Sequence, residues 1–244
     1  MSTSFLERYE IDQSAPTRAV AFRDAALRVI APAAVLWALI IGLGMLIMGP
    51  LGGLPAENTL SRDVQSGRTS TWDNITMIWS RIGNTEYIIA TCVVVSLIIL
   101  WRTRQWWWAI IPGIAIATQA TVFVLATVVV GRSRPDVAHL DPAPPTSSYP
   151  SGHVGASTAL YLSFALMAQR IETPWLRRLV TVLVLIVPIL VSYARLYRGM
   201  HHLSDILVGM LNGIVCALLA WYWVRRGRGG RADEAQPSGV RTVS

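Results

Sequence analysis

Six long apolar runs are the feature that most constrains how this chain can fold. They occupy residues 29–48, 88–101, 106–130, 154–168, 179–194 and 206–224. A bilayer-spanning helix needs roughly 20 apolar residues, and most of the runs approach that length once uncharged flanks are included. A large soluble helical core would show polar positions every three or four residues, whereas residues 90–100 show almost none. We therefore predict an all-α, polytopic membrane protein with a six-transmembrane-helix bundle.

The arginines indicate how the spans are oriented. All 21 basic residues are arginine, because the sequence contains no lysine. With both termini in the cytoplasm, 14 arginines fall inside and seven outside, as the positive-inside rule prefers. The outer seven are Arg62, Arg68, Arg81, Arg132, Arg134, Arg195 and Arg198. We expect a multi-pass protein of the cell membrane, and the net charge of +7 gives no reason to expect nucleic-acid binding.

The chain divides into three parts. Residues 1–27 are polar, and their amphipathic stretch at 20–27 suits a cytoplasmic helix on the membrane surface; an unstructured tail is the alternative. Residues 28–225 form the six-helix domain, in which the mixed-charge segment 50–81 suits a short outward amphipathic element. Residues 226–244 are rich in Gly, Arg and Ser and are expected to be a disordered cytoplasmic tail.

Two smaller patterns concern packing. The aromatic triplets at 106–108 and 221–223 are typical of belts at the membrane interface. Gly209 and Gly213 have the small-xxx-small spacing that lets helices approach closely. We favour packing within the chain over dimerisation, and the oligomeric state stays open.

Three polar segments stand at the outward ends of predicted spans, at residues 131–135, 149–153 and 195–205. Polar residues near the bilayer usually have a functional reason. In the last segment, a helix beginning near His201 would place His201 and Asp205 on one face. A carboxylate could then hold one imidazole nitrogen and leave the other as a nucleophile, although a lone His-x3-Asp more often pairs only locally.

The other two segments indicate an oxyanion as the ligand. Arg134 and Arg195 end the third and fifth spans, and converging guanidinium groups suit phosphate. Ser151, Gly152 and His153 open the fourth span after a proline, and a helix start of this kind is an anion site. An ordinary N-cap is the alternative. No cluster of carboxylates suggests a metal, and no cofactor is expected.

These segments resemble the three signatures of the type 2 phosphatidic acid phosphatase (PAP2) superfamily: Lys-x6-Arg-Pro, Pro-Ser-Gly-His and Ser-Arg-x5-His-x3-Asp. Residues 134–135 match the end of the first, and residues 150–153 match the second in full. Arg195, His201 and Asp205 match the third at the right spacing. The resemblance runs from the third span to the sixth.

The resemblance implies a role for each matched residue. His201 would attack phosphorus to form a phosphohistidine, and Asp205 would orient it. His153 would protonate the leaving lipid oxygen and later activate water. The phosphoryl oxygens would be held, without a metal, by Arg134, Arg195, Ser151 and the Gly152 N–H.

Two positions depart from the signatures. Thr127 stands where the first signature has its lysine, and Ala194 stands where the third has serine. The loss of a cation at Thr127 is the more serious. Arg132 could supply the charge if the third span ends near Gly131; a headgroup-binding or topological role for Arg132 is the alternative.

The resemblance implies a lipid phosphatase that acts on a phosphate monoester or pyrophosphate at the external leaflet. A polyprenyl pyrophosphate is the first substrate to consider, because bacteria use this family to recycle carrier lipids. Phosphatidylglycerol phosphate and phosphatidic acid are alternatives. A phosphotransferase that passes the group to an acceptor lipid, and a catalytically weak lipid-binding protein, also stay open.

Overall fold

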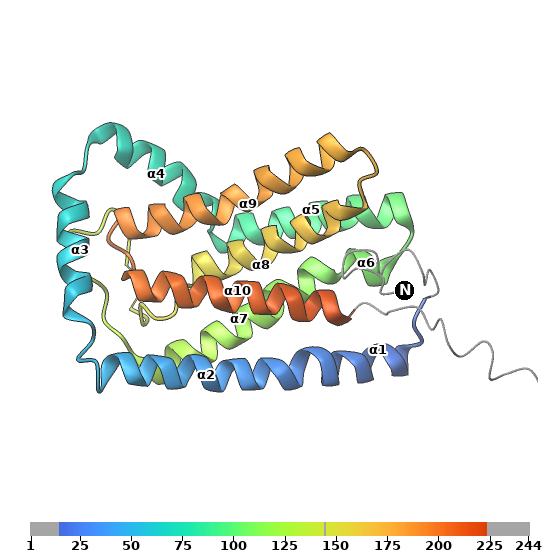
Figure 1. Ribbon diagram of the computed structural model, residues 1–244, viewed down its shortest axis with the longest axis horizontal. Coiled ribbons are helices and arrows are strands. Elements are labelled where there is room, and N and C mark those ends of the chain that lie inside the picture. The colour runs from blue at the N-terminus through green and yellow to red at the C-terminus, as the bar shows by residue number, and fades with distance from the viewer. Residues whose placement is uncertain (1–14, 144, 224–244) are drawn as a thin grey trace, which may run out of the picture.

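The computed structural model describes residues 15–143 and 145–223, and these residues form helices and no β-strand (Figure 1). In chain order the elements are α1 (Arg18–Ala25), a π-helical segment (Ala26–Ile30), α2 (Ala31–Met48), α3 (Pro55–Ser66), α4 (Ser70–Ile82), α5 (Thr85–Thr103), α6 (Trp106–Ala109), α7 (Ile111–Val130), α8 (Gly152–Met167), a 3-10 turn (Ala168–Arg170), α9 (Pro174–Tyr197) and α10 (Leu203–Trp223). The predicted all-α class is confirmed. Residues 1–14 and the predicted disordered tail at 226–244 lie outside the described residues.

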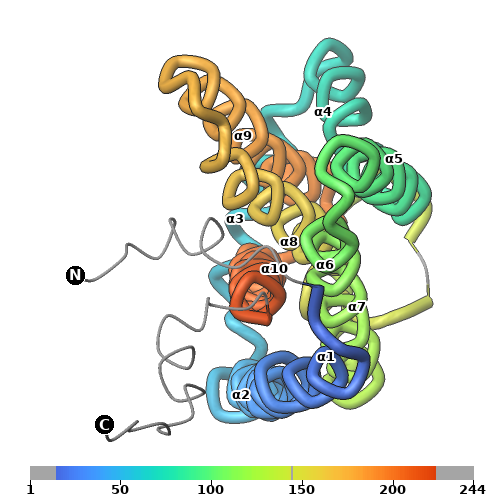
Figure 2. Tube along the Cα trace, turned by 90° about the vertical axis from the view of Figure 1, so that its right-hand side faces the viewer, coloured from blue at the N-terminus to red at the C-terminus, as the bar shows by residue number. Residues whose placement is uncertain are grey.

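Six long helices run along a common direction (Figures 1 and 2). Five of them are long and apolar enough to cross a membrane: Arg18–Met48, Thr85–Thr103, Trp106–Val130, Pro174–Tyr197 and Leu203–Trp223. The sixth, α8, has 16 residues and is extended at its end by the 3-10 turn. The predicted polytopic, all-helical membrane bundle is confirmed; α8 completes the six long helices but is not among the five candidate spans.

The centre of the bundle is α8, which packs against α7, α9 and α10 (Figure 2). Three glycines allow the approach of α10. A Cβ on Gly209 would lie 2.5 Å from the carbonyl oxygen of Ser151, and one on Gly213 would lie 2.5 Å from that of Gly155. The small-residue spacing therefore serves packing within the chain, as predicted, and it holds the start of α8 directly against α10.

The first span begins earlier than the sequence suggested. Arg18–Met48 is one 31-residue helix, so the amphipathic stretch at 20–27 continues into the span and does not form a separate surface helix. The π-helical turn has a local cause. Pro32 has no N–H to donate to the carbonyl of Arg28, and the N–H of Ala31 bonds instead to Ala26, five residues back.

The segment predicted to face outward forms two helices, α3 and α4, where the sequence suggested one short element. The break falls at Gly67 to Thr69, and the Thr69 hydroxyl accepts the N–H of Trp72 as an N-cap at 3.3 Å. In Figure 1, α3 crosses the end of the bundle and α4 leads back toward α5, and α4 packs against α9. Of the two, α4 lines the cavity described below, through Met77, Ser80 and Arg81.

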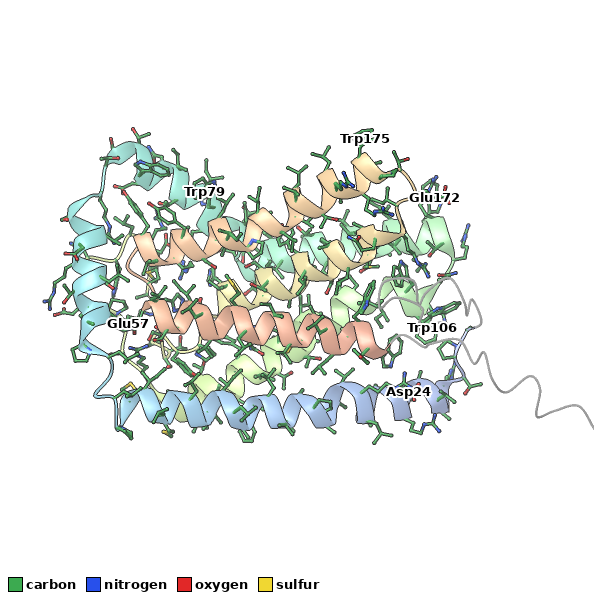
Figure 3. All side chains as sticks on the ribbon, in the orientation of Figure 1. Asp24, Glu57, Trp79, Trp106, Glu172 and Trp175 are labelled. Carbon is green, nitrogen blue, oxygen red and sulfur yellow. The ribbon has the colours of Figure 1, made fainter. Side chains whose placement is uncertain are left out.

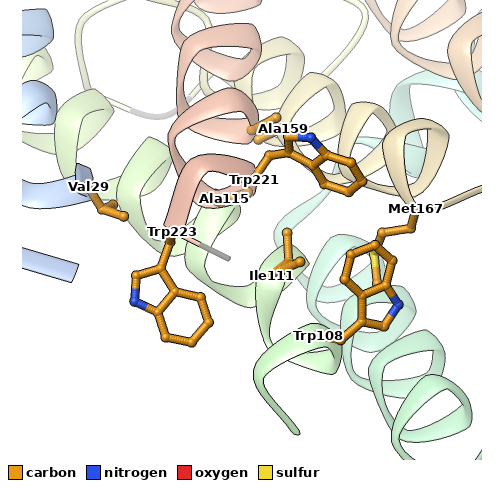
Figure 4. Packing of buried hydrophobic residues seen from close by; sticks show 10 residues of the cluster. Val29, Trp108, Ile111, Ala115, Ala159, Met167, Trp221 and Trp223 are labelled. Atoms are coloured by element: carbon orange, nitrogen blue, oxygen red, sulfur yellow. The ribbon is translucent and has the colours of Figure 1, made fainter. Parts of the chain in front are cut away.

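The opposite end of the bundle is packed with tryptophan. Trp108 and Trp221 are only 3% and 2% exposed, their ring centroids lie 5.4 Å apart, and Trp223 is buried in the same core cluster (Figure 4). These three rings pack with Ile111 in the core, so they contribute to packing between helices, and the interpretation as interfacial belts stays a prediction. Trp106, labelled in Figure 3, is 40% exposed.

Candidate active site

The three polar segments of the sequence meet at the end of the bundle that carries α3 and α4 (Figure 1). They are the segment after α7, the start of α8, and the turn between α9 and α10. A cavity of about 1080 Å3 lies there. Five of the seven predicted site residues line it, namely Arg134, Gly152, His153, Arg195 and His201. The other two, Ser151 and Asp205, are fully buried and do not line the cavity.

His201 lies in the turn between α9 and α10. Gly199, two residues earlier, has a positive φ of 74°, which favours glycine and turns the chain back toward the cavity. The Nδ1 atom of His201 lies 2.7 Å from the carbonyl oxygen of Ser148. A carbonyl can only accept, so Nδ1 carries the hydrogen and Nε2 keeps its lone pair.

The surroundings of His201 also favour an uncharged ring. Burial lowers the pKa of His201 well below its usual value, and the positive charge of Arg195 lowers it further. Both effects disfavour the imidazolium form. The imidazole is therefore neutral near pH 7, with Nε2 unprotonated.

Asp205 bonds to other partners than the predicted one. Its Oδ2 accepts the backbone N–H of His202 at 2.9 Å and lies 3.1 Å from that residue's Nδ1, while its Oδ1 lies 2.6 Å from Arg132. His201 is not among these partners, so the hydrogen bonds do not support the prediction that Asp205 orients His201. Because α10 begins only at Leu203, Asp205 is its third residue and reaches back to the N–H before the helix, as in a capping box.

Arg132 connects this helix start to α3. Its guanidinium lies 2.6 Å from Asp205 and 2.8 Å from Glu57, with a side chain only 2% exposed. Glu57 in turn accepts the N–H of Ser204 at 2.6 Å. Figure 3 shows Glu57 beside the start of α10. Arg132 is thus the centre of a buried ionic cluster that holds α3 against α10.

This position of Arg132 bears on whether it replaces the signature lysine that is missing at Thr127. α7 ends at Val130 and Gly131 is left-handed, with φ 62°, as the proposed compensation required. The turn, however, directs Arg132 into the ionic cluster, and neither Thr127 nor Arg132 lines the cavity. The structure gives Arg132 a different role from the missing lysine.

Arg134 and Arg195 are each anchored through one nitrogen. Nη1 of Arg134 donates to the carbonyl of Met200 at 2.8 Å. Nη1 of Arg195 donates to the Ser80 hydroxyl and to the Asp141 carboxylate, both at 2.9 Å. The Nε atoms of both arginines are buried and have no partner among the described residues. Buried donors normally have partners, so these two suit an anion bound in the cavity.

The second histidine, His153, contacts Asn84, the residue immediately before α5. Nε2 of His153 lies 3.0 Å from Oδ1 of Asn84, and the Asn84 amide nitrogen donates to Glu86 at 3.0 Å. Since the Glu86 carboxylate only accepts, the amide oxygen of Asn84 must accept from His153 Nε2–H. The Nδ1 atom of His153 is then the nitrogen that can gain and lose a proton.

The start of α8 presents backbone donors to the site. Ser151 is the N-cap and Gly152 the first helical residue, so the first N–H groups have no acceptor within the helix. A Cβ at Gly152 would lie 2.8 Å from the ring of Phe123, which restricts this position to glycine. The Ser151 hydroxyl is buried and without a partner in the described part of the chain; its contact with phosphate stays a prediction.

Four residues at the site were missed by sequence reasoning: Ser148, which bonds His201 through its carbonyl; Asn84, which bonds His153; and Asp141 with Arg198, an ion pair at 2.7 Å that lines the cavity. A backbone carbonyl leaves no sequence signal. Arg198 did carry one, because it is an outward arginine within the third polar segment. The described residues contain no group of three or more His, Cys, Asp or Glu placed to hold a metal ion.

Known proteins resemble the chain in sequence profile and in fold. The profile of the PAP2 superfamily matches residues 106–228, about half of the chain, from α6 to beyond α10. No curated protein sequence matches the chain significantly.

Two solved structures share the fold. The first is a transmembrane PAP2-type phosphatidylglycerolphosphate phosphatase from Bacillus subtilis, with a TM-score of 0.67 and 18% identity over 85% of this chain and 98% of that one. The second is LpxE from Aquifex aeolicus, with a TM-score of 0.55 and 18% identity over 66% and 92%. Together with the profile match, these findings show that the chain belongs to the PAP2 superfamily.

Proposed function

We propose that the protein is a membrane lipid phosphatase that works through a phosphohistidine at His201. The observation that carries this proposal is the set of groups around one cavity. It combines a neutral imidazole whose Nε2 is unprotonated with two buried guanidinium Nε donors, of Arg134 and Arg195, that lack partners among the described residues. A nucleophile beside preorganised anion donors is what phosphoryl transfer requires.

In the first step, His201 Nε2 attacks phosphorus. The Nε2–P bond forms while the bond between phosphorus and the lipid oxygen breaks. His153, held at Nε2 by Asn84, takes up a proton on Nδ1 when the anionic phosphate binds beside it and gives that proton to the leaving oxygen. Arg134, Arg195 and the first N–H groups of α8 neutralise the charge on the three phosphoryl oxygens.

In the second step, His153 is neutral and takes a proton from water. The water oxygen bonds to phosphorus as the Nε2–P bond breaks, and free phosphate leaves. His201 returns to its neutral form with the hydrogen still on Nδ1, and His153 is protonated again. No metal or cofactor enters either step.

The shape of the cavity supports a lipid as the substrate. Beyond the polar groups, its lining is apolar and comes from α5 and α7, with Ile88, Ile116, Phe123 and Gly113 among its residues. Phe123 and Gly113 are ten residues apart on α7, so the apolar part extends roughly 15 Å along the helix. A phosphorylated chain could place its phosphate at the histidines and its tail between these helices.

Among lipids, we propose a polyprenyl pyrophosphate at the external leaflet as the first substrate to test. The arginine distribution supports the outward position. Phosphatidylglycerol phosphate and phosphatidic acid are the alternatives, and the described activity of the Bacillus subtilis neighbour is a reason to include the former in the same panel.

The test is phosphate release by the purified protein in detergent, measured over these three lipids, with His201→Ala as the matched control. We expect release from at least one lipid by the wild type and none by the variant. A labelled donor lipid mixed with unlabelled acceptor separates hydrolysis from transfer, because a phosphotransferase would label the acceptor lipid. If the wild type forms neither free phosphate nor labelled acceptor lipid, the remaining hypothesis is a catalytically weak lipid-binding protein.

A further inference from the structure

Asp141 is an acidic residue inside a site that binds an anion. Its Oδ2 lies 2.9 Å from Arg195 Nη1 and 3.0 Å from the Ser80 hydroxyl, and its Oδ1 lies 2.7 Å from Arg198 Nη2. It lines the cavity together with both arginines. No PAP2 signature contains it, since it lies in the proline-rich loop between α7 and α8.

We propose that Asp141 is a positioning residue that aims the guanidinium of Arg195 at the phosphoryl group. This inference rests on the proposed phosphate site. One carboxylate bridges two arginines that are each 4% exposed, and two buried like charges would otherwise repel each other and move apart. Asp141 thus allows Arg195 and Arg198 to lie side by side at the cavity.

The hydrogen bonds to Asp141 and Ser80 leave the Nε edge of the Arg195 guanidinium available for a ligand. Asp141 and Ser80 occupy the two hydrogens of Nη1, whereas Nε is buried and has no partner among the described residues. The Nε side of a guanidinium can donate a forked pair of bonds to an oxyanion. Asp141 therefore fixes the direction of Arg195 without occupying the edge that the phosphoryl group would use.

The charge state of Asp141 agrees with this role. Burial alone would raise the pKa of its carboxyl, but the hydrogen bond from Arg198 and the charges of Arg195 and Arg198 lower it below its usual value. The carboxylate is therefore ionised at neutral pH, and both arginines keep their partner.

The backbone around Asp141 is held by other contacts. Arg198 donates to the Leu140 carbonyl at 2.8 Å and accepts the Leu140 N–H on its own carbonyl at 3.1 Å. Arg68 donates to the Ala138 carbonyl at 2.7 Å. Because these bonds do not involve the Asp141 side chain, Asp141→Asn should keep the loop in place and change mainly the orientation of the arginines.

The experiment measures binding of vanadate, a phosphate analogue, by calorimetry on purified full-length protein in detergent. We expect Asp141→Asn to weaken binding about tenfold, as the loss of a charge-assisted contact predicts. Asp136→Asn is the matched control, because Asp136 is an exposed acidic residue of the same loop, and it should bind like the wild type. Ser80→Ala, which removes only the neutral partner of Arg195, should have a smaller effect.

A double-mutant cycle separates positioning from a merely structural role. In an Arg195→Gln background, Asp141→Asn should change vanadate affinity less than twofold, because its effect acts through Arg195. Additive losses would overturn the inference, and so would tighter binding by Asp141→Asn, which would identify Asp141 as a competing anion. If the wild type binds vanadate but releases no phosphate from any lipid, the proposed hydrolysis fails while the Asp141 result still stands.

Discussion

The Nδ1 atom of His201 lies 2.7 Å from the carbonyl oxygen of Ser148, and this backbone contact orients the proposed nucleophile. We expect His201→Ala to lose turnover by orders of magnitude, because no other group can form the Nε2–P bond. The measurement is phosphate release, together with trapping of labelled phosphoprotein from the wild type under alkaline conditions, because a phosphohistidine is lost in acid.

Two results decide that prediction. His139→Ala serves as the control, since His139 is an exposed histidine of the loop between α7 and α8 and should retain wild-type rates. Retention of more than about a tenth of the activity by His201→Ala would be incompatible with nucleophilic catalysis by this residue.

The depressed pKa of His201 predicts how folding stability depends on pH. The unfolded chain binds a proton at His201 near pH 6.5, whereas the folded protein resists it because the ring is buried beside Arg195. This contribution is fully present above pH 6.5 and is lost as the pH falls below it. Between pH 6.5 and 5.5 it amounts to about 1 kcal/mol.

The corresponding measurement is thermal unfolding in detergent at pH 7.5, 6.5 and 5.5. We expect the Tm of the wild type to fall by several degrees more than that of His201→Gln between pH 6.5 and 5.5, and the two to change alike between 7.5 and 6.5. Identical pH dependence in both proteins over the whole range would contradict the assignment of a neutral buried imidazole.

Chelators should leave the activity intact. The proposed charge stabilisation comes from Arg134, Arg195 and the start of α8, which need no metal. The assay compares initial rates of phosphate release before and after dialysis against EDTA. A loss that Mg²⁺ or another divalent ion restores would show that a metal site contributes to the reaction.

Much of the fold and of the site could be predicted from the sequence. Apolar run lengths located the six helices. The polar segments at one end of the predicted spans indicated that Arg134, His153, Arg195 and His201 converge, and all four line one cavity. The partner of Asp205 could not be predicted, because it depends on where α10 begins. A start at His201 would have brought the two side chains to one face, whereas the observed start at Leu203 does not.

The same limit applies to the loop and the packing. Asp141 looked like an ordinary loop carboxylate, since nothing in the local sequence indicates that the loop folds back onto the end of α9. The tryptophans at the opposite end had the composition of an interfacial belt, and only the docking of α6 and α10 shows which rings are buried. The sequence therefore does not predict which individual side chains make contacts between distant segments.

Asp205→Asn should affect stability more than catalysis. The carboxylate bonds His202 and Arg132, and removing one partner of a buried ion pair costs about 3–5 kcal/mol. His201 keeps its contact with the Ser148 carbonyl, so kcat of the folded variant should stay within about tenfold of the wild type. A loss of kcat as large as that of His201→Ala, at unchanged Tm, would mean that Asp205 acts on His201 during the reaction.

The last prediction concerns Arg132 and Thr127. Arg132 is buried between Glu57 and Asp205, so Arg132→Ala should lower the Tm strongly and leave the KM of the remaining folded protein unchanged within about twofold. Arg132→Lys should be intermediate, because one ammonium cannot reach two carboxylates as a planar fork does. Thr127→Lys should not restore the Tm of Arg132→Ala, since Thr127 belongs to neither the ionic cluster nor the cavity lining. The opposite result would be a KM raised about tenfold in Arg132→Ala at unchanged Tm, with the KM restored by Thr127→Lys. That result would mean that both positions serve one phosphate site and that Arg132 replaces the missing lysine.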